Sequence, residues 1–235
     1  MIVFNNLGHS YKNKQNADPI VWVDAQDATT YTLSGNDVLT LDNKGSLGGA
    51  MTLNGSVKFA NSGFESWSGS DYITRDLGET FLPTNSFTMV TTFDFQNIAQ
   101  NSNRGWWGSI YGDISNRVSH IRENSVISNI SFDVGTLNRL DVNYILGLKS
   151  MVTSYDITTN TLIQLNYDGS NQSYVNITYN NINNSVIWLL RAGTGAVNTN
   201  SGQNNPLHEF RLYDRAFTLT EMQDLQTELN NKYTP

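Results

Sequence analysis

The chain has 235 residues, of which 38% are hydrophobic and 11% are aromatic, enough to form one continuous hydrophobic core. Its formal net charge of −7 excludes the excess of cations that binding to nucleic acid or to anionic membranes requires. The absence of cysteine excludes disulfides, thiolate catalysis and cysteine-type zinc sites. Only 15% of the residues are charged, so Asn, Ser and Thr must supply much of the polar surface, and these types favour turns and strands over helices.

The first segment of the chain differs from the rest. Residues 1–18 show little periodicity and end before Pro19, which biases the preceding residue towards an extended conformation. We therefore predict an N-terminal arm over residues 1–18 and one folded domain over residues 19–235. Too few apolar residues follow Met1 to form a signal-peptide core, so we expect an uncleaved, soluble chain. The arm is expected to attach the domain to a neighbouring subunit or particle.

From residue 20 onwards, short runs rich in β-branched and aromatic residues are separated by Asn, Gly, Asp and Ser, a spacing typical of a β-sandwich. In residues 86–95 the large apolar side chains share one face of a predicted strand, and the other face is largely polar. We expect the apolar face to be buried. Its members are Phe87, Met89, Phe93 and Phe95.

Two hairpins are predicted in the middle of the chain. Residues 151–157 and 163–167 both alternate, and a Thr-Thr-Asn turn lies between them. A second turn begins at Asp168-Gly169, where the residue types tolerate positive φ, and it leads into another alternating run at 175–179. The predicted fold class is therefore an all-β, two-sheet antiparallel sandwich.

One amphipathic helix is predicted at the carboxyl end. Thr218 and Glu221 have capping-box spacing, and Lys232 lies in the last turn, where a cation suits the helix dipole. An apolar stripe consists of Met222, Leu225 and Leu229. The opposite face is expected to carry Gln223, Asp224, Gln226, Glu228 and Asn230. We expect this helix to lock the sandwich and to form no ligand site.

Three stretches resemble the laminin-G-like family of concanavalin-A-like jelly rolls. They are residues 20–30, which begin with Ile-Val-Trp-Val-Asp-Ala, the Asp-Gly turn in residues 165–169, and the run His-Glu-Phe-Arg-Leu-Tyr-Asp-Arg-Ala-Phe-Thr at residues 208–218. The resemblance covers nearly the whole chain and implies a jelly-roll β-sandwich with two curved sheets. It also implies a frequent role in sugar recognition or adhesion, but one sandwich fold serves many tasks.

The same resemblance implies that a calcium ion often binds at a loop rim. The acids that could supply oxygen ligands are Asp24, Asp27, Asp113 and Asp168. Lone acids beside turns more often form the turn than bind a metal, so no residue is assigned as a metal ligand.

Catalysis is not predicted. Related jelly rolls that cleave polysaccharides hold two carboxylates at alternate positions of one strand, whereas Asp94, Asp133 and Glu209 have no such partner. The three histidines, at positions 9, 120 and 208, are too scattered for a metal motif.

Aromatic side chains are the strongest functional signal, because a flat ring stacks on the apolar face of a sugar. The candidate carbohydrate-binding residues are Trp67, Tyr72, Trp106 and Trp107. For the adjacent pair at 106 and 107, filling the sandwich or bracing a loop is the alternative. Three further aromatic residues lie inside apolar runs and are expected in the core, namely Trp22, Phe87 and Trp188.

Two functional hypotheses follow. The first is a phage virion surface protein, such as a capsid decoration protein or part of a fibre or tail appendage, which contacts other virion proteins through its arm, forms an oligomer or assembly and binds polysaccharide. The alternative is a secreted or cell-surface carbohydrate-binding adhesin, although the missing export signal counts against it. A glycoside hydrolase with an unrecognised site is a weaker alternative.

Overall fold

The computed structural model describes residues 18–67, 70–78, 85–95, 108–113, 116–124, 127–134, 138–143, 147–175, 185–190 and 206–233. The first strands are β1 (Val21–Asp24), β2 (Tyr31–Ser34), β3 (Asp37–Leu41), β4 (Thr52–Asn54), β5 (Lys58–Ala60), β6 (Gly63–Glu65), β7 (Tyr72–Asp76) and β8 (Phe87–Phe95). They are followed by β9 (Gly108–Asp113), β10 (Asn116–Asn124), β11 (Ile127–Val134), β12 (Asn138–Asn143), β13 (Gly147–Asp156), β14 (Thr161–Leu165), β15 (Asn171–Val175), β16 (Val186–Leu189), β17 (Leu207–Tyr213) and the helix α1 (Leu219–Tyr233).

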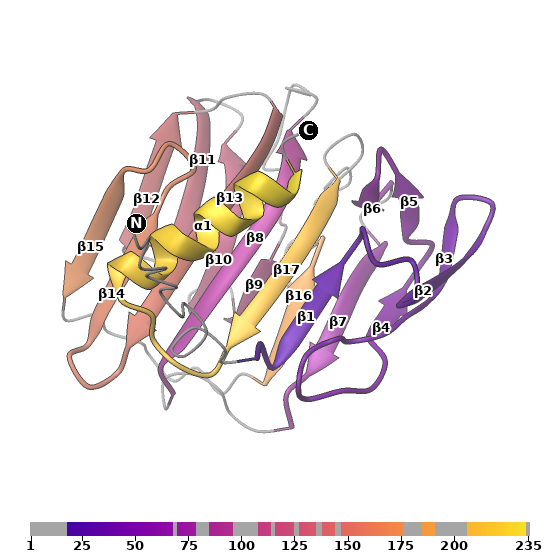
Figure 1. The fold of residues 1–235 in the computed structure, drawn as a ribbon, viewed down its shortest axis with the longest axis horizontal. Helices are drawn as coiled ribbons and strands as arrows, with labels where there is room; N and C mark the ends of the chain where they lie inside the picture. Colours follow the sequence, from indigo (N-terminus) through magenta and orange to yellow (C-terminus); the bar gives the residue numbers. More distant parts are fainter. Residues whose placement is uncertain are drawn as a thin grey trace, which may run out of the picture.

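The strands form two antiparallel sheets that pack face to face. The ten-stranded sheet has the order β15-β14-β13-β8-β17-β6-β5-β3-β2, and β1 pairs with β17 beside this path. The seven-stranded sheet has the order β12-β11-β10-β9-β16-β7-β4. Figure 1 shows α1 lying across the outer face of the ten-stranded sheet, with the seven-stranded sheet behind. The predicted fold class, a two-sheet antiparallel jelly-roll sandwich with one C-terminal helix, is confirmed.

The first predicted hairpin is present, and the second turn leads into β15, which begins at Asn171, earlier than predicted; residues 176–179 of the predicted run lie outside the described residues. β13 pairs with β14 from Asp156↔Thr161 onwards, and β14 pairs with β15 up to Leu165↔Asn171. Asn160 and Gly169 have φ values of 47° and 81°, so each turn uses a residue type that tolerates the left-handed region.

The core between the sheets contains the predicted face of β8. Phe87, Met89 and Phe93 are fully buried, whereas the side chain of Phe95 lies outside the described part of the chain. The opposite face of β8 is buried too, because the segment that follows β17 covers it. There Thr88 accepts a hydrogen bond from the amide of Phe217 at 3.0 Å and donates one to the carbonyl of Arg215 at 2.9 Å.

The helix α1 packs through the predicted apolar stripe, and its capping box is formed. The Thr218 amide donates to Glu221 Oε2 at 2.8 Å, and the Glu221 amide donates to Thr218 Oγ1 at 3.3 Å. The prediction for Gln226 is wrong, because this side chain is buried and its amide nitrogen donates to the carbonyls of Ser150 and Asn166, at 2.9 and 2.8 Å. Two backbone carbonyls thus replace water as the hydrogen-bond partners of the Gln226 side chain.

Candidate functional site

The four aromatic residues predicted to bind carbohydrate do not share one described element. Trp106 and Trp107 lie outside the described residues. Trp67 follows β6 of the ten-stranded sheet, is 41% exposed and donates its indole N–H to Glu65 Oε2 at 2.7 Å. Lys58 Nζ also lies 5.5 Å from the centroid of this ring. Trp67 therefore already has polar contacts on its edge and a cation near its ring.

Tyr72 is part of an aromatic pair on the other sheet. Its ring centroid lies 5.0 Å from that of Trp188, with an interplanar angle of 31°. The two side chains come from the adjacent strands β7 and β16. Ile73, Ile187 and Leu189 are fully buried in the core, so strand alternation directs Tyr72 and Trp188 towards the outer face of the seven-stranded sheet.

The structure thus corrects two core predictions. Trp188 is half-buried because only alternate residues of its apolar run face the core. Trp22 is also half-buried and lies on the outer face of the ten-stranded sheet, since Val21 and Val23 fill the core instead. Lys44 Nζ lies 4.1 Å and Arg211 Cζ 4.7 Å from the centroid of the Trp22 ring. Phe87, the third aromatic residue expected in the core, is fully buried there.

Short polar side chains lie next to the Tyr72–Trp188 pair. On β4, Asn54 is the cross-strand neighbour of Tyr72, and Thr52 is that of Thr74. Thr74 is in turn the neighbour of Trp188, and it lies 3.4 Å from Asn54 Nδ2. Rings next to hydroxyl and amide groups can stack on a sugar and hydrogen-bond its hydroxyls. This group forms the aromatic face, which consists of Thr52, Asn54, Tyr72, Thr74 and Trp188.

Two carboxylates that are far apart in the sequence meet beneath α1. Asp24 and Glu209 are cross-strand neighbours, and Lys232 Nζ lies 2.9 Å from the first and 2.7 Å from the second. Glu209 has no exposed surface. It accepts hydrogen bonds from Trp22 Nε1 at 2.7 Å, Arg211 Nε at 2.5 Å and the Tyr233 hydroxyl at 2.8 Å. Along its own strand Glu209 has no second carboxylate, as the sequence indicated, and its acidic neighbour Asp24 comes from the adjacent strand β1.

This carboxylate pair does not have the properties of a catalytic acid and base. Burial by itself would raise the pKa of Asp24, but its hydrogen bonds and charge interaction with Lys232, assisted by Lys44 and by the Gln26 amide, outweigh burial and lower it. A general acid needs a proton to donate and access to substrate. Both carboxylates are instead buried and form ion pairs in a network that joins β1, β17 and α1.

Of the four acids considered for calcium, the three whose side chains are described already have other partners. Asp24 and Asp27 bind the ammonium group of Lys44 at 3.1 and 2.7 Å, and hydrogen bonds from Lys44 and Thr29 lower the pKa of Asp27 to about 2. Asp168 accepts from the amide and hydroxyl of Ser170, as a turn former does. The side chain of Asp113 lies outside the described residues. The described part of the chain contains no cluster of three His, Asp or Glu side chains that could hold a metal ion.

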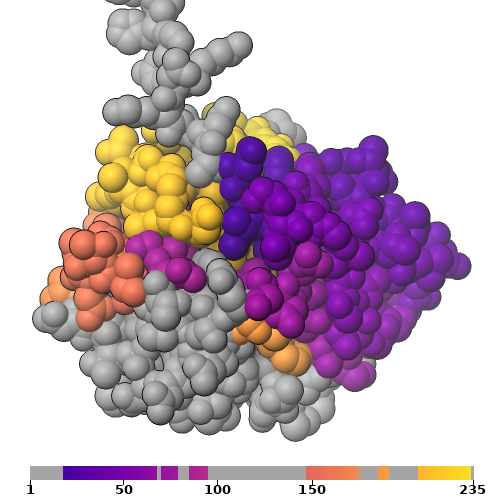
Figure 2. Space-filling model, turned by 90° about the horizontal axis from the view of Figure 1, so that it is seen from below, coloured from indigo at the N-terminus to yellow at the C-terminus, as the bar shows by residue number. Residues whose placement is uncertain are grey.

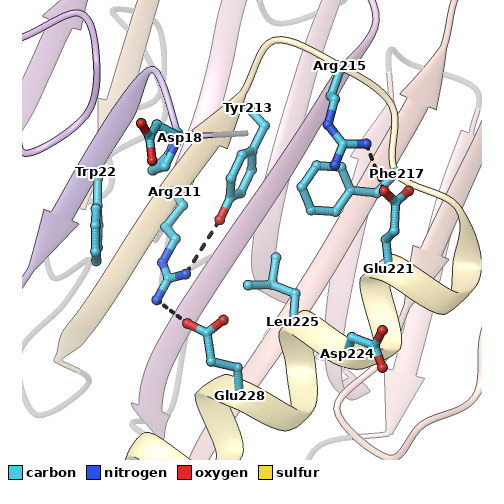
Figure 3. Close-up of a pocket in the computed structure, with 11 residues that line it drawn as sticks. Asp18, Trp22, Arg211, Tyr213, Arg215, Phe217, Glu221, Asp224, Leu225 and Glu228 are labelled. Atoms are coloured by element: carbon cyan, nitrogen blue, oxygen red, sulfur yellow. Dashed lines mark hydrogen bonds and ion pairs between the residues drawn. The ribbon is translucent and has the colours of Figure 1, made fainter. Parts of the chain in front are cut away.

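A pocket of about 450 Å³ opens between α1, β17 and the segment that enters β1 (Figure 3). Its buried lining residues are Pro19, Arg211, Tyr213, Phe217 and Leu225. Arg211 Nη2 lies 3.0 Å from Glu228 of α1, and Arg215 Nη1 lies 3.0 Å from Glu221. A pocket thus lies against the helix that was expected to form no ligand site.

Among the described residues, no helix is long and apolar enough to cross a membrane.

Comparisons with known proteins identify the fold and no family. No family model and no curated protein sequence matches the chain. The binding domain of botulinum neurotoxin serotype D/C VPI 5993 is similar in structure, with a TM-score of 0.63 and 11% identity over 92% of this chain and 53% of that one. A Trypanosoma rangeli sialidase in complex with sialic acid has a TM-score of 0.56 and 10% identity over 93% of this chain and 34% of that one. The chain therefore spans about half of the first protein and about a third of the second, and at these identities only the fold is shared.

Proposed function

We propose that this chain is a non-enzymatic glycan-binding module and that the aromatic face is its binding surface. The observation that carries the proposal is the Tyr72–Trp188 ring pair, flanked by Thr and Asn side chains of β4 and β7. A ring supplies apolar contact to a pyranose, and the hydroxyl and amide groups supply directional hydrogen bonds. This face lies on the sheet opposite α1, so it does not involve the buried charge network.

The comparisons support the proposal at the level of the scaffold. The same fold occurs in a protein described as a neurotoxin binding domain and in a sialidase whose structure holds sialic acid. Because one fold hosts unrelated activities, the residues of the aromatic face, and not the shared fold, support glycan binding. The burial of Asp24 and Glu209 and their ion pairs with Lys232 support a binding role over hydrolysis, since neither carboxylate has access to substrate.

A glycan array probed with the full chain, followed by calorimetric titration of the best ligand, tests the proposal. Trp188→Ala and Tyr72→Ala are each expected to weaken the affinity about tenfold, which corresponds to about 1.4 kcal/mol. Trp67→Ala is the matched control, because this exposed tryptophan follows β6 of the other sheet. It should leave the affinity unchanged. Melting temperatures confirm that each variant is folded.

Two results would contradict the proposal. One is a folded full chain that binds no glycan on the array. The other is a loss of affinity in Trp67→Ala with none in Trp188→Ala, which would move the binding surface to the region around β6.

The biological location stays a prediction. We propose a phage virion surface protein, and a secreted or cell-surface adhesin is the alternative. A polar surface rich in Asn supports either setting. Mass spectrometry of purified particles decides between them: copies in the particle support the virion protein, and recovery only from medium or cell envelope supports the adhesin. The predicted oligomer is checked by light scattering of the same preparation.

A further inference from the structure

The pocket beside α1 is a second candidate site. It lies between the segment that enters β1 and the carboxyl-terminal β17 and α1, and Figure 2 shows these two parts of the chain side by side in indigo and yellow. Its volume of about 450 Å³ lies within the range of pockets that enclose a small molecule. Among the described residues, the lining includes none of the aromatic face, which belongs to the other sheet. A ligand in this pocket would therefore be separate from one on the aromatic face.

Two guanidinium groups of the lining are held in place. Arg211 is 6% exposed; its Nε donates to buried Glu209 at 2.5 Å, and its Nη2 lies 3.0 Å from Glu228. Arg215 Cζ lies 4.1 Å from the centroid of the buried Phe217 ring. Side chains that are already fixed by such contacts lose little conformational freedom when a ligand binds.

The hydroxyl group of Tyr213 is the observation that points to a ligand. Tyr213 is 4% exposed and lines the pocket, and in Figure 3 its hydroxyl points towards the Arg211 guanidinium. Arg211 Nη1 donates to this hydroxyl over 3.4 Å, which is its one hydrogen bond among the described residues. A guanidinium cannot accept, so the hydroxyl proton is left without an acceptor. A buried donor without a partner costs free energy, and a ligand oxygen in the pocket would recover it.

The polar groups of the lining favour a neutral ligand that both donates and accepts. The guanidinium groups of Arg211 and Arg215 can only donate, whereas the carboxylates of Glu221 and Glu228 can only accept. Each hydroxyl of a sugar does both, so one sugar can bridge groups of the two kinds. A cation would instead meet the two guanidinium groups and an anion the carboxylates, and contact between like charges weakens binding.

We propose that this pocket binds one neutral pyranose unit, with Tyr213 donating to an oxygen of the sugar and Glu228 accepting from one of its hydroxyls. The side chain of Glu228 is 59% exposed and contacts Arg211 through Oε1, so Oε2 can accept from a ligand. The two guanidinium groups supply further donors, and Leu225 supplies apolar contact to C–H groups. The proposal goes beyond the aromatic face and does not depend on it, because the two surfaces share no described residue.

Saturation-transfer NMR with the full chain tests the proposal. The probes are the methyl glycosides of glucose, galactose, mannose and N-acetylglucosamine. They are also titrated against Trp188→Ala combined with Tyr72→Ala, the double variant that removes both rings of the aromatic face. At least one probe should bind this double variant. In the same background, Tyr213→Phe should weaken binding about fivefold by removing one neutral hydrogen bond, and Glu228→Gln about tenfold by removing a charged acceptor.

Two changes outside the pocket lining are the matched controls. Tyr155→Phe removes the hydroxyl of another buried tyrosine, and Asp37→Asn removes a carboxylate of β3. Neither should change the affinity. Melting curves confirm the fold of each variant.

The outcomes separate this pocket from the aromatic face. Binding by the double variant that Tyr213→Phe and Glu228→Gln both weaken supports the pocket, whatever the aromatic face binds. Binding by the full chain that disappears in the double variant would overturn the pocket and leave the aromatic face as the binding surface. Binding by the double variant that neither change weakens would also overturn it, because the sugar would then lie elsewhere. So would a folded full chain that binds none of the four probes.

Discussion

Replacing Glu209 by Gln tests whether the buried charge network holds α1 on the sheet. The carboxylate has no exposed surface and receives four donors, from Trp22, Arg211, Lys232 and Tyr233. Each carboxylate oxygen accepts from two of these donors, and a glutamine replaces one oxygen by an NH₂ group that cannot accept. About half of the hydrogen bonds are therefore lost. Arg211 and Lys232 also lose a counter-charge. Breaking one member of a buried ion pair costs about 3–5 kcal/mol.

The assay is urea denaturation followed by circular dichroism, with the free energy of unfolding extrapolated to water. Glu228→Gln is the matched control, because Glu228 contacts the same arginine but its side chain is 59% exposed. That change should cost less than about 1 kcal/mol, as exposed ion pairs do. A loss below about 1 kcal/mol in Glu209→Gln would refute the reasoning, since the network would then contribute no more than a surface ion pair.

Three further predictions concern the core, the helix cap and acid stability. Phe93→Ala should lower the free energy of unfolding by about 3–5 kcal/mol, because the ring is fully buried between the sheets; a near-unchanged melting temperature would contradict this packing. Thr218→Ala should cost about 1 kcal/mol by removing the observed cap, whereas Thr227→Ala, an exposed mid-helix control, should cost less. The folded-state pKa of Asp24 lies below the ordinary value of 3.8, so its contribution is complete above that pH and is lost as the pH falls through the folded value. Denaturation as a function of pH should therefore show stability falling below about pH 4, and Asp24→Asn should show a smaller fall over the same range; equal slopes would contradict the assignment.

Local patterns in the sequence were sufficient for the elements themselves. Alternation predicted the buried face of β8, turn residues at positive φ predicted the two hairpins, and the spacing of Thr218 and Glu221 predicted the start of α1. Each of these signals depends on residues within a few positions of one another. Strand alternation and helix-capping hydrogen bonds act over a few residues. These elements could therefore be predicted without knowing which other element each one packs against.

The candidate site depended on the tertiary structure. Trp22 and Trp188 lie in apolar runs, and a run alone does not tell which alternate residues face the other sheet. Tyr72 was predicted as a sugar-binding residue, but its partner Trp188 is recognised only when β7 and β16 become neighbours.

The sequence by itself determined the fold class, the hairpins, the capped helix and the exclusion of cysteine chemistry, because those properties follow from composition and from short-range periodicity. Only the tertiary structure decided that Asp24 and Glu209 share one lysine and that Gln226 is buried on sheet carbonyls. It also decided that a pocket forms where the chain enters β1. Strand register and helix docking bring groups that are far apart in the sequence within hydrogen-bond distance. No local pattern encodes which distant donor or acceptor a buried polar group will meet.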